Sequence, residues 1–375
     1  MERFDIVIVG GGIAGASAGA ALAPHRRVLL LERESQPGYH TTGRSAALLT
    51  PFYGTHTVRL LNLAGADFYR EPPAGFADAP LLSPRGALYF GRPEDAEKVR
   101  EDYEAALALC DEIVPLDEAG ARALVPALRP GVVGSAYLDP TTADMDVGAI
   151  LQGFLRQFRR AGGTVRTDAE VTAIERGGEG WIVVCGDTAV SAPIVIDAAG
   201  AWADTVAQMA GLEPIGIEPK RRTAMLIDPP AVYDTSRWPT LTDVIETFYV
   251  KPDAGRLMCS PADETPSPPM DAWPDEMDLA ICAERVMEHL DLDIRRIEHK
   301  WAGLRSFAPD RTPVAGFDPR AEGFFWLAGQ GGYGIMTAPS LAAVTAHLIL
   351  GTALPERLEA AGFDLKALAP GRFLG

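Results

Sequence analysis

The sequence predicts a two-domain α/β protein, in which one domain has a doubly wound parallel sheet and the other an antiparallel sheet plus helices. Three observations support this fold class. The chain has 375 residues, more than the roughly 100–200 typical of one domain. Runs of apolar residues that suit buried parallel strands occur at its start, middle and end. The blocks between them differ in pattern, as expected of inserted segments that form a second domain.

The first elements follow the order strand, turn, helix, strand. Residues 4–9 form an apolar run interrupted only by Asp5, and residues 28–31 form a second apolar run. Between them, small residues over 13–22 favour a helix that packs closely on a sheet. Residues 194–197 and 324–328 are two further buried strands, and a helix extends from the second of them to residue 350. This order is typical of the opening of a doubly wound sheet.

The intervening blocks contain amphipathic helices and short strands. Helices are expected near 58–69, 93–109 and 147–160, because their apolar residues recur at helical spacing. Short strands are expected at 164–166, 171–175 and 181–185. Residues 219–301 read as antiparallel strands with one helix near 279–290. We therefore assign residues 1–50, 144–218 and 302–375 to the first domain, and residues 51–143 and 219–301 to the second.

Composition and charge narrow the possible partners. The formal net charge is −17, so nucleic acid and anionic membrane surfaces are poor partners for this chain. Its four cysteines form no CxxC pair, which argues against a zinc site or a redox dithiol. The sequence starts with a polar segment and contains no long apolar run, and we therefore expect a cytoplasmic protein without stable membrane insertion.

A glycine-rich turn between the first strand and the first helix has the spacing of a dinucleotide-binding motif. Its glycines allow a tight turn, close approach of a pyrophosphate and close helix packing. The amides at the helix N-terminus would then face phosphate. Glu32 ends the second strand, where its carboxylate would accept hydrogen bonds from a ribose and repel a 2′-phosphate, which disfavours NADP. The predicted binding residues here are Gly10, Gly12, Ile13, Ala14, Gly15 and Glu32.

Two further segments favour FAD over NAD. Residues 41–47 begin shortly after Glu32 and combine hydroxyls, small residues and Arg44, a composition suited to lying along a flavin and its pyrophosphate. A second glycine-rich turn, residues 329–334, again lies between a strand and a helix. The positive end of that helix would face the part of a flavin that becomes anionic on reduction. We therefore expect a Rossmann-like FAD-binding domain.

With these segments assembled, the chain resembles the D-amino-acid oxidase superfamily of flavoproteins, and within it the D-arginine dehydrogenase type. The similarity extends over essentially the whole length. The segments that carry it most specifically are residues 32–40, 42–47, 220–222, 301–307 and 330–335. The resemblance adds cofactor contacts to those of the first turn: Arg33, Thr42, Arg44, Ser45, Ala46, Ala47, Leu48, Val171, Gly200, Trp202, Gly303, Gly331, Gly332, Tyr333, Gly334, Ile335, Met336 and Thr337.

The resemblance also implies a reaction. An amino acid would lose hydride from Cα to the flavin, and water would release a 2-oxo acid and ammonia from the imine. Arg222, Arg305, Tyr249 and Tyr53 would hold the substrate carboxylate, because a guanidinium pairs with a carboxylate through two parallel hydrogen bonds. The backbone carbonyl of Gly332 would accept from the substrate amine. Tyr53 lies in a loop that could act as a gate, and either oxygen or a quinone could reoxidise the flavin.

Departures from the D-arginine dehydrogenase pattern concern the substrate side chain. In those enzymes a carboxylate, a histidine and a glutamine would fall at Ala87, Leu48 and Met336. Apolar residues at these positions disfavour a charged D-arginine head, which would be buried unpaired. Residues 301–307 and position 48 contain no cysteine or histidine that could form a covalent link to the flavin. We therefore expect non-covalent FAD.

Other functions stay open at this point. One alternative is a glycine, sarcosine or cyclic secondary-amine oxidoreductase of the same superfamily. Another, of a different class, is a flavin-binding protein without turnover that acts through a protein partner. His40 and His56 lie on loops near the predicted site, and the sequence leaves a role for either one open.

Overall fold

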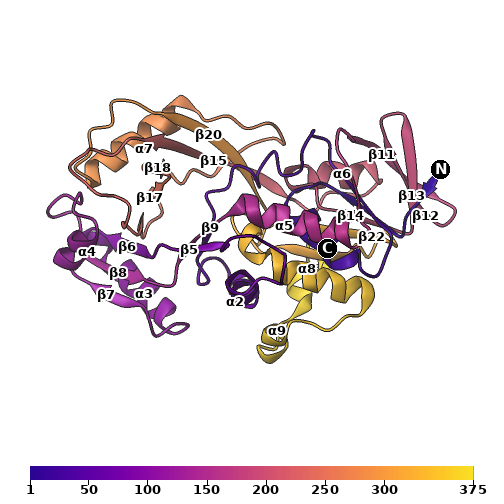
Figure 1. Ribbon diagram of the computed structural model, residues 1–375, viewed down its shortest axis with the longest axis horizontal. Helices are drawn as coiled ribbons and strands as arrows, with labels where there is room; N and C mark the ends of the chain where they lie inside the picture. The colour runs from indigo at the N-terminus through magenta and orange to yellow at the C-terminus, as the bar shows by residue number, and fades with distance from the viewer. Residues whose placement is uncertain (375) are drawn as a thin grey trace.

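The computed structural model describes residues 1–374 and has two lobes, one built on a parallel sheet and the other on a largely antiparallel sheet (Figure 1). The first sheet has the strand order β10-β3-β2-β14-β22-β21, and all neighbours are parallel except β21 and β22. Its strands are Thr164–Arg166, Val28–Leu31, Ile6–Val9, Ile194–Asp197, Phe324–Ala328 and Val314–Phe317. The predicted parallel sheet is confirmed.

Both faces of this sheet are covered, which explains why its strands are apolar throughout. Ile6 and Ile8 point to one face, which packs on the helices α1 (Ile13–Leu22), α5 (Val147–Arg160) and α8 (Gly334–Leu350). Val7 and Val9 point to the other face, toward α6 (Ala203–Met209) and the strands β11 (Val171–Gly177), β12 (Gly180–Cys185) and β13 (Thr188–Ala192). The result is a three-layer domain.

The second sheet forms most of the other lobe. Its order is β19-β15-β18-β17-β16-β6-β8-β7, with β20 also paired to β15, and β16 and β6 run parallel while the other pairs are antiparallel. The bounds are Thr265–Pro266, Glu218–Ile227, Arg256–Ser260, Tyr249–Asp253, Thr240–Asp243, Ala87–Gly91, Ser135–Asp139, Val114–Leu116 and, for β20, His299–Phe307. The predicted second domain of antiparallel sheet plus helices is thus confirmed, with one parallel pair added.

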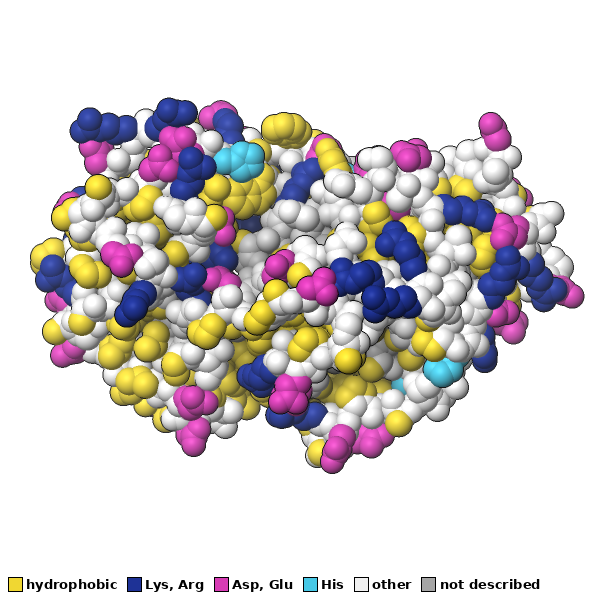
Figure 2. Space-filling view, viewed as in Figure 1, with side chains coloured by type: hydrophobic (Ala, Val, Ile, Leu, Met, Phe, Trp, Pro, Cys, Tyr) yellow, Lys and Arg dark blue, Asp and Glu magenta, His cyan; other side chains and the backbone are white. Residues whose placement is uncertain are grey.

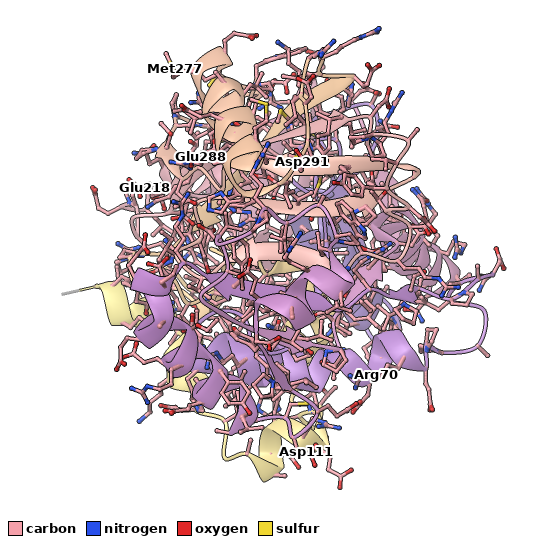
Figure 3. All side chains as sticks on the ribbon, turned by 90° about the vertical axis from the view of Figure 1, so that its left-hand side faces the viewer. Arg70, Asp111, Glu218, Met277, Glu288 and Asp291 are labelled. Carbon is pink, nitrogen blue, oxygen red and sulfur yellow. The ribbon has the colours of Figure 1, made fainter. Side chains whose placement is uncertain are left out.

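Helices also pack on this second sheet. Helix α7 (Glu276–His289) covers it with Leu279, Cys282 and Val286, and Figure 3 shows this side, with Met277 and Glu288 on α7 and Glu218 at the start of β15. The remaining elements are β1 (Glu2–Arg3), β4 (Leu48–Leu49), α2 (His56–Arg70), β5 (Leu82–Pro84), η1 (Pro93–Asp95), α3 (Ala96–Leu107), α4 (Glu118–Leu124), β9 (Ala143–Met145), η2 (Gly200–Trp202), α9 (Glu356–Ala360), η3 (Leu365–Leu368) and η4 (Pro370–Phe373).

Strand β20 crosses the predicted division of the chain. Its residues 299–307 pair with β15, although the predicted boundary lies between residues 301 and 302. Its last residue, Phe307, also bridges to Gln330 in the turn before α8. The same strand therefore joins the second sheet to the first domain, and the exact division of the chain stays a prediction. Within residues 1–374, no helix has both the length and the apolar character to cross a bilayer.

A buried carboxyl group in the central strand leads to a prediction about pH. Asp197 is fully buried, its Oδ1 accepts from the amide of Ala199 at 3.1 Å, and its Oδ2 has no partner. Burial raises the pKa of Asp197 well above its ordinary range. An acid with a raised pKa keeps a proton that the unfolded chain releases, so this residue makes the fold less stable as the pH rises through that interval.

Replacing Asp197 with Asn removes this titration. We expect the melting temperature of the variant to improve relative to the original protein as the pH rises from about 4.5 to about 8. The difference should grow by up to about 1.4 kcal/mol of stability per pH unit between the two pKa values. Thermal melting of both holoproteins across this range provides the measurement. Two curves that stay parallel would show that the carboxyl titrates alike in both states.

Candidate active site

The glycine-rich turn after β2 packs so tightly that side chains are excluded from it. Gly10 has φ +107°, and a Cβ there would lie 2.4 Å from the carbonyl oxygen of Ala198. A Cβ at Gly15 would lie 2.0 Å from the oxygen of Gly10. Thr42 completes the turn, because its Oγ1 accepts from the amide of Ile13 at 3.0 Å. The N-terminus of α1 is therefore held against the open side of the turn, as a pyrophosphate site requires.

Glu32 is fixed beside this turn. Its Oε2 accepts from the amide of Gly11 and its Oε1 from the amide of Glu34, each at 2.9 Å. The side chain is buried and yet lines the large cavity. A carboxylate held in this way has lone pairs left for ribose hydroxyls. It would repel a 2′-phosphate, as the sequence predicts.

The segment over residues 41–47 is fastened to β20. Thr41 donates from its hydroxyl to the carbonyl of Leu304 at 2.7 Å, and the indole of Trp301 donates to the carbonyl of Arg44 at 3.0 Å. The guanidinium of Arg44 donates to Ala272 and Ala302 and forms an ion pair with Asp271. Arg44 lines the cavity, but its charge is already paired with Asp271. Its predicted role along the flavin would therefore be to hold the segment in place and not to supply a free charge.

Most of the predicted site residues surround a single cavity that is lined by residues of both lobes. The surface is hollowed there, and acidic and basic side chains are scattered over both lobes (Figure 2). The predicted residues that line the cavity are Gly10, Gly12, Ile13, Ala14, Glu32, Arg33, Thr42, Arg44, Ser45, Ala46, Val171, Gly200, Trp202, Arg222, Tyr249, Gly303, Arg305, Gly331, Gly332, Gly334 and Ile335.

Seven predicted residues lie outside the cavity wall: Gly15, Ala47, Leu48, Tyr53, Tyr333, Met336 and Thr337. Their contacts are with other residues of the chain, behind the cavity wall. Tyr53 and Tyr333 have ring centroids 5.3 Å apart, and Thr337 donates to the carbonyl of Tyr333 at 2.9 Å. The sulfur of Met336 accepts from the amide of Thr50 at 3.3 Å.

Ala87, like Leu48 and Met336, does not border this cavity. The apolar side-chain pocket predicted from these three residues therefore finds no support in the cavity wall, and it stays a prediction.

The two candidate histidines differ in position. His40 lines the cavity, packs against the ring of Trp202 at 4.8 Å and shares a hydrogen bond of 2.8 Å with Glu34. His56 is the first residue of α2, is exposed and does not line the cavity.

The register of β15 and β20 brings the two predicted arginines to one face. Arg222 pairs with Gly303, and Lys220 pairs with Arg305. Paired residues in an antiparallel sheet point to the same side, so Arg222 and Arg305 are diagonal neighbours with side chains on the cavity side. Gly303 between them leaves the backbone open toward the cavity.

Arg305 and Arg222 differ in their partners. Within residues 1–374, the guanidinium of Arg305 makes no side-chain hydrogen bond and no ion pair; it packs on Gly332, where a Cβ would lie 3.0 Å from Nη1. Arg222 donates from Nε to the carbonyl of Asp263 at 2.8 Å and from Nη2 to Glu264 at 3.3 Å. Arg305 is thus a cation in an enclosed site that lacks an anion, and a substrate carboxylate would satisfy it.

Titration keeps these groups in the forms that bind a carboxylate. Burial alone lowers the pKa of Arg305, but Tyr249 and Tyr53 raise it and the net shift is upward, so the guanidinium stays charged. Burial raises the pKa of Tyr53 and raises that of Tyr333 to about 12. Both hydroxyls are therefore neutral donors at physiological pH.

Sequence reasoning missed a carboxylate beside the site. Glu264 binds Arg311 through two hydrogen bonds of 2.8 and 2.9 Å, in addition to Arg222. Both residues lie in irregular segments, and no motif marks them. A search for unassigned charges in loops that follow sheet strands would have selected them.

The cavity suits FAD at each segment that was predicted for it. The turn at Gly10 excludes side chains, Glu32 faces the cavity, and the second glycine turn stands on β20, with the amide of Gly331 donating to Ser306 at 2.8 Å. FAD would supply the hydride acceptor at this end.

Leu48 and residues 301–307 offer no thiol or imidazole. We expect acid precipitation of the purified yellow protein to leave free FAD in the supernatant; colour that stays with the pellet would show a covalent link.

Comparisons with known proteins agree with this geometry. Residues 5–348 match the model of the DAO family, described as FAD dependent oxidoreductase. Glycine oxidase from Geobacillus kaustophilus is 24% identical over 100% of this chain and 98% of its own length. Its crystal structure has a TM-score of 0.85 with full coverage of both chains at 22% identity.

Two further solved structures are similar in fold. L-Proline dehydrogenase from P. horikoshii has a TM-score of 0.84 at 20% identity, over 100% of this chain and 98% of that one. Iminodiacetate oxidase from Chelativorans sp. BNC1 has a TM-score of 0.79 at 22% identity, over 95% and 98%. The family match covers nearly the whole chain and confirms both the predicted superfamily and FAD. This protein belongs to the DAO family of FAD-dependent oxidoreductases.

Proposed function

We propose that the protein catalyses oxidative deamination of D-amino acids to 2-oxo acids and ammonia. The observation that carries this proposal is the unpaired guanidinium of Arg305 over Gly332, in the cavity that also holds the two glycine turns. A carboxylate on Arg305 would place the adjoining Cα and amine beside Gly332, whose backbone carbonyl can accept from the amine. Fixing Cα–H in this way is the main contribution of the chain, because FAD supplies the redox chemistry.

The electron balance is that of a two-electron oxidation. Hydride leaves Cα, a proton leaves nitrogen, and the resulting imine is hydrolysed by water to the 2-oxo acid and ammonia. Tyr53 and Tyr249 would donate hydrogen bonds near the carboxylate, as predicted, and both interact electrostatically with Arg305. Bound FAD would accept the hydride, and either oxygen or a quinone would take the two electrons onward.

Preference for a neutral side chain over D-arginine is part of the proposal. The carboxylates that line the cavity are Glu32, which is bound to the amides of Gly11 and Glu34, and Glu170, which precedes β11. Glu264, near Arg222, is already bound by two arginines. Glu170 adjoins Val171, a predicted cofactor contact, so we expect it to lie along FAD and not at the substrate. A substrate guanidinium would then lose water without gaining a carboxylate partner.

A second candidate follows from the comparisons: oxidation of glycine or of a secondary amine. Glycine oxidase and iminodiacetate oxidase are among the proteins similar to this chain. Both substrates carry a carboxylate next to the amine, so Arg305 would serve them equally. The two candidates differ in what occupies the side-chain position on Cα.

Anaerobic bleaching of the flavin by a panel of amines tests the proposal. We expect D-Leu, D-Met and D-Phe to reduce the flavin faster than D-Arg and D-Lys, and the L-enantiomers to be inert. Fastest reduction by glycine, sarcosine or a cyclic imino acid would favour the second candidate. A flavin that no compound reduces would instead support a binding protein without turnover.

A further inference from the structure

Glu264 lies in the short connection between β18 and β19 and is anchored there. The neighbouring Asp263 accepts from the amide of Thr223 at 2.6 Å and from its hydroxyl at 3.0 Å, which fastens the connection to β15. Arg311 holds the Glu264 carboxylate from the other side with two hydrogen bonds of 2.8 and 2.9 Å. The hydrogen bond from Arg311 lowers the pKa of Glu264, so the carboxylate is ionised.

Arg311 is itself held in place. Its guanidinium lies 4.1 Å from the ring centroid of Phe307, and that ring packs on the backbone of Gly331. The carboxylate of Glu264 therefore has a rigid donor on one side and the cavity-lining Arg222 on the other. Lys220, the other cation on this face of β15, is paired with Glu218 at 3.2 Å.

Glu264 is the carboxylate that pairs with Arg222, the arginine next to Arg305 on the cavity face. Arg222 and Arg305 are diagonal neighbours on the cavity face, and Arg222 shares the carboxylate of Glu264 with Arg311, while no acidic side chain among residues 1–374 forms an ion pair with Arg305. A ligand with one carboxylate meets one free guanidinium. A second carboxylate on the same ligand, directed at Arg222, would meet the negative charge of Glu264.

We propose that Glu264 is a specificity-determining residue, which occupies Arg222 and thereby restricts the site to substrates with one carboxylate. This inference rests on the proposed function, in which Arg305 binds the substrate carboxylate. Without the Glu264 carboxylate, neither arginine would have an anionic partner, and Arg222 would keep only its hydrogen bond to the carbonyl of Asp263. The site would then suit dicarboxylates, because charge-assisted pairs could form at both ends of the ligand.

The test uses the oxidised holoenzyme and the perturbation of the flavin spectrum by acetate and malonate, a monocarboxylate and a dicarboxylate. We expect Glu264→Gln to raise the ratio of malonate to acetate affinity by at least about tenfold, the effect of one added charged hydrogen bond. Glutamine keeps the size of the side chain and an acceptor for Arg311. Glu218→Gln is the matched control: it removes the carboxylate that pairs with Lys220 on the same face and should leave the ratio unchanged.

A ratio that stays constant in Glu264→Gln, or affinities for both ligands that fall together, would overturn the proposal, since Glu264 would then only support the fold. If the glutamine variant loses FAD, the malonate-to-acetate affinity ratio is measured for Glu264→Ala instead, with the same expected and contradicting results. The double variant Glu264→Gln/Arg222→Met should lose the gain for malonate. Failure of the proposed function looks different, because acetate would then bind the original protein and Arg305→Met equally well.

Discussion

Replacing Arg305 with Met is expected to lower kcat/KM for amino acids by about 10²- to 10³-fold while FAD stays bound. The guanidinium is enclosed, lines the cavity and has no partner among residues 1–374, so its removal deletes the carboxylate contact without freeing another buried charge. Loss of such a charge-assisted pair costs roughly 2–5 kcal/mol. Methionine retains much of the aliphatic volume of the side chain. Stopped-flow reduction and the flavin absorbance of the purified variant provide the two measurements.

Lys220→Met is the control for this variant. Lys220 is the residue paired with Arg305 across β15 and β20, but it binds Glu218 and does not line the cavity. Its replacement removes a cation from the same face and should change kcat/KM by less than about threefold, as is usual for a partly exposed ion pair. If both variants lose activity to the same degree, Arg305 acts through the general charge of the sheet rather than by contact.

Replacing Gly15 with Ala is expected to abolish FAD retention. The added methyl carbon would lie 2.0 Å from the carbonyl oxygen of Gly10, a backbone atom that cannot move without opening the turn. Because the turn, the start of α1 and Glu32 are joined by hydrogen bonds, its opening would disturb the whole pyrophosphate side of the cavity. The ratio of bound flavin to protein after gel filtration provides the measurement.

Gly148→Ala is the matched control for Gly15→Ala. Gly148 lies in the first turn of a helix, α5, and a methyl carbon added there would come no closer than 3.5 Å to its nearest neighbour, the Oδ1 atom of Asp146. This variant should retain FAD fully, and circular dichroism should show equal helix content in both. A Gly15→Ala protein that purifies with full flavin would mean that the helix can shift away from the turn at little cost.

The first domain is largely predictable because its signals are local. Apolar strands covered on both faces and a small-residue helix predict the bounds Ile13–Leu22, Val28–Leu31 and Ile194–Asp197 as the structure has them. The second domain is predicted less completely. Strands β6 and β8 fall in a block whose pattern indicates helices and loops, and the parallel pairing of β6 with β16 joins segments about 150 residues apart. Such pairing depends on tertiary contacts that local periodicity does not report.

The candidate site, too, is predictable where its signals are local and unpredictable where it depends on tertiary contacts. Gly10 and Glu32 belong to a motif whose spacing reflects one strand–turn–helix unit, and the structure brings them together. The pairing of Arg44 with Asp271 and of Arg222 with Glu264 was not predicted, because each joins a named segment to an irregular loop. Whether an arginine is free or already neutralised decides its chemistry, and that depends on which loop folds over it.

The position of β20 has a mechanical consequence. Along this single strand, Gly303 and Arg305 face the cavity, residues 299–307 pair with β15, and Phe307 bridges to Gln330 in the turn of the first domain. A rigid rotation of one lobe away from the other would have to break that strand or its bridge. We therefore expect this strand to resist a clamshell opening of the lobes during turnover. On this expectation, substrate entry and product release would use displacement of peripheral loops, while the bridge keeps Arg305 beside the second glycine turn.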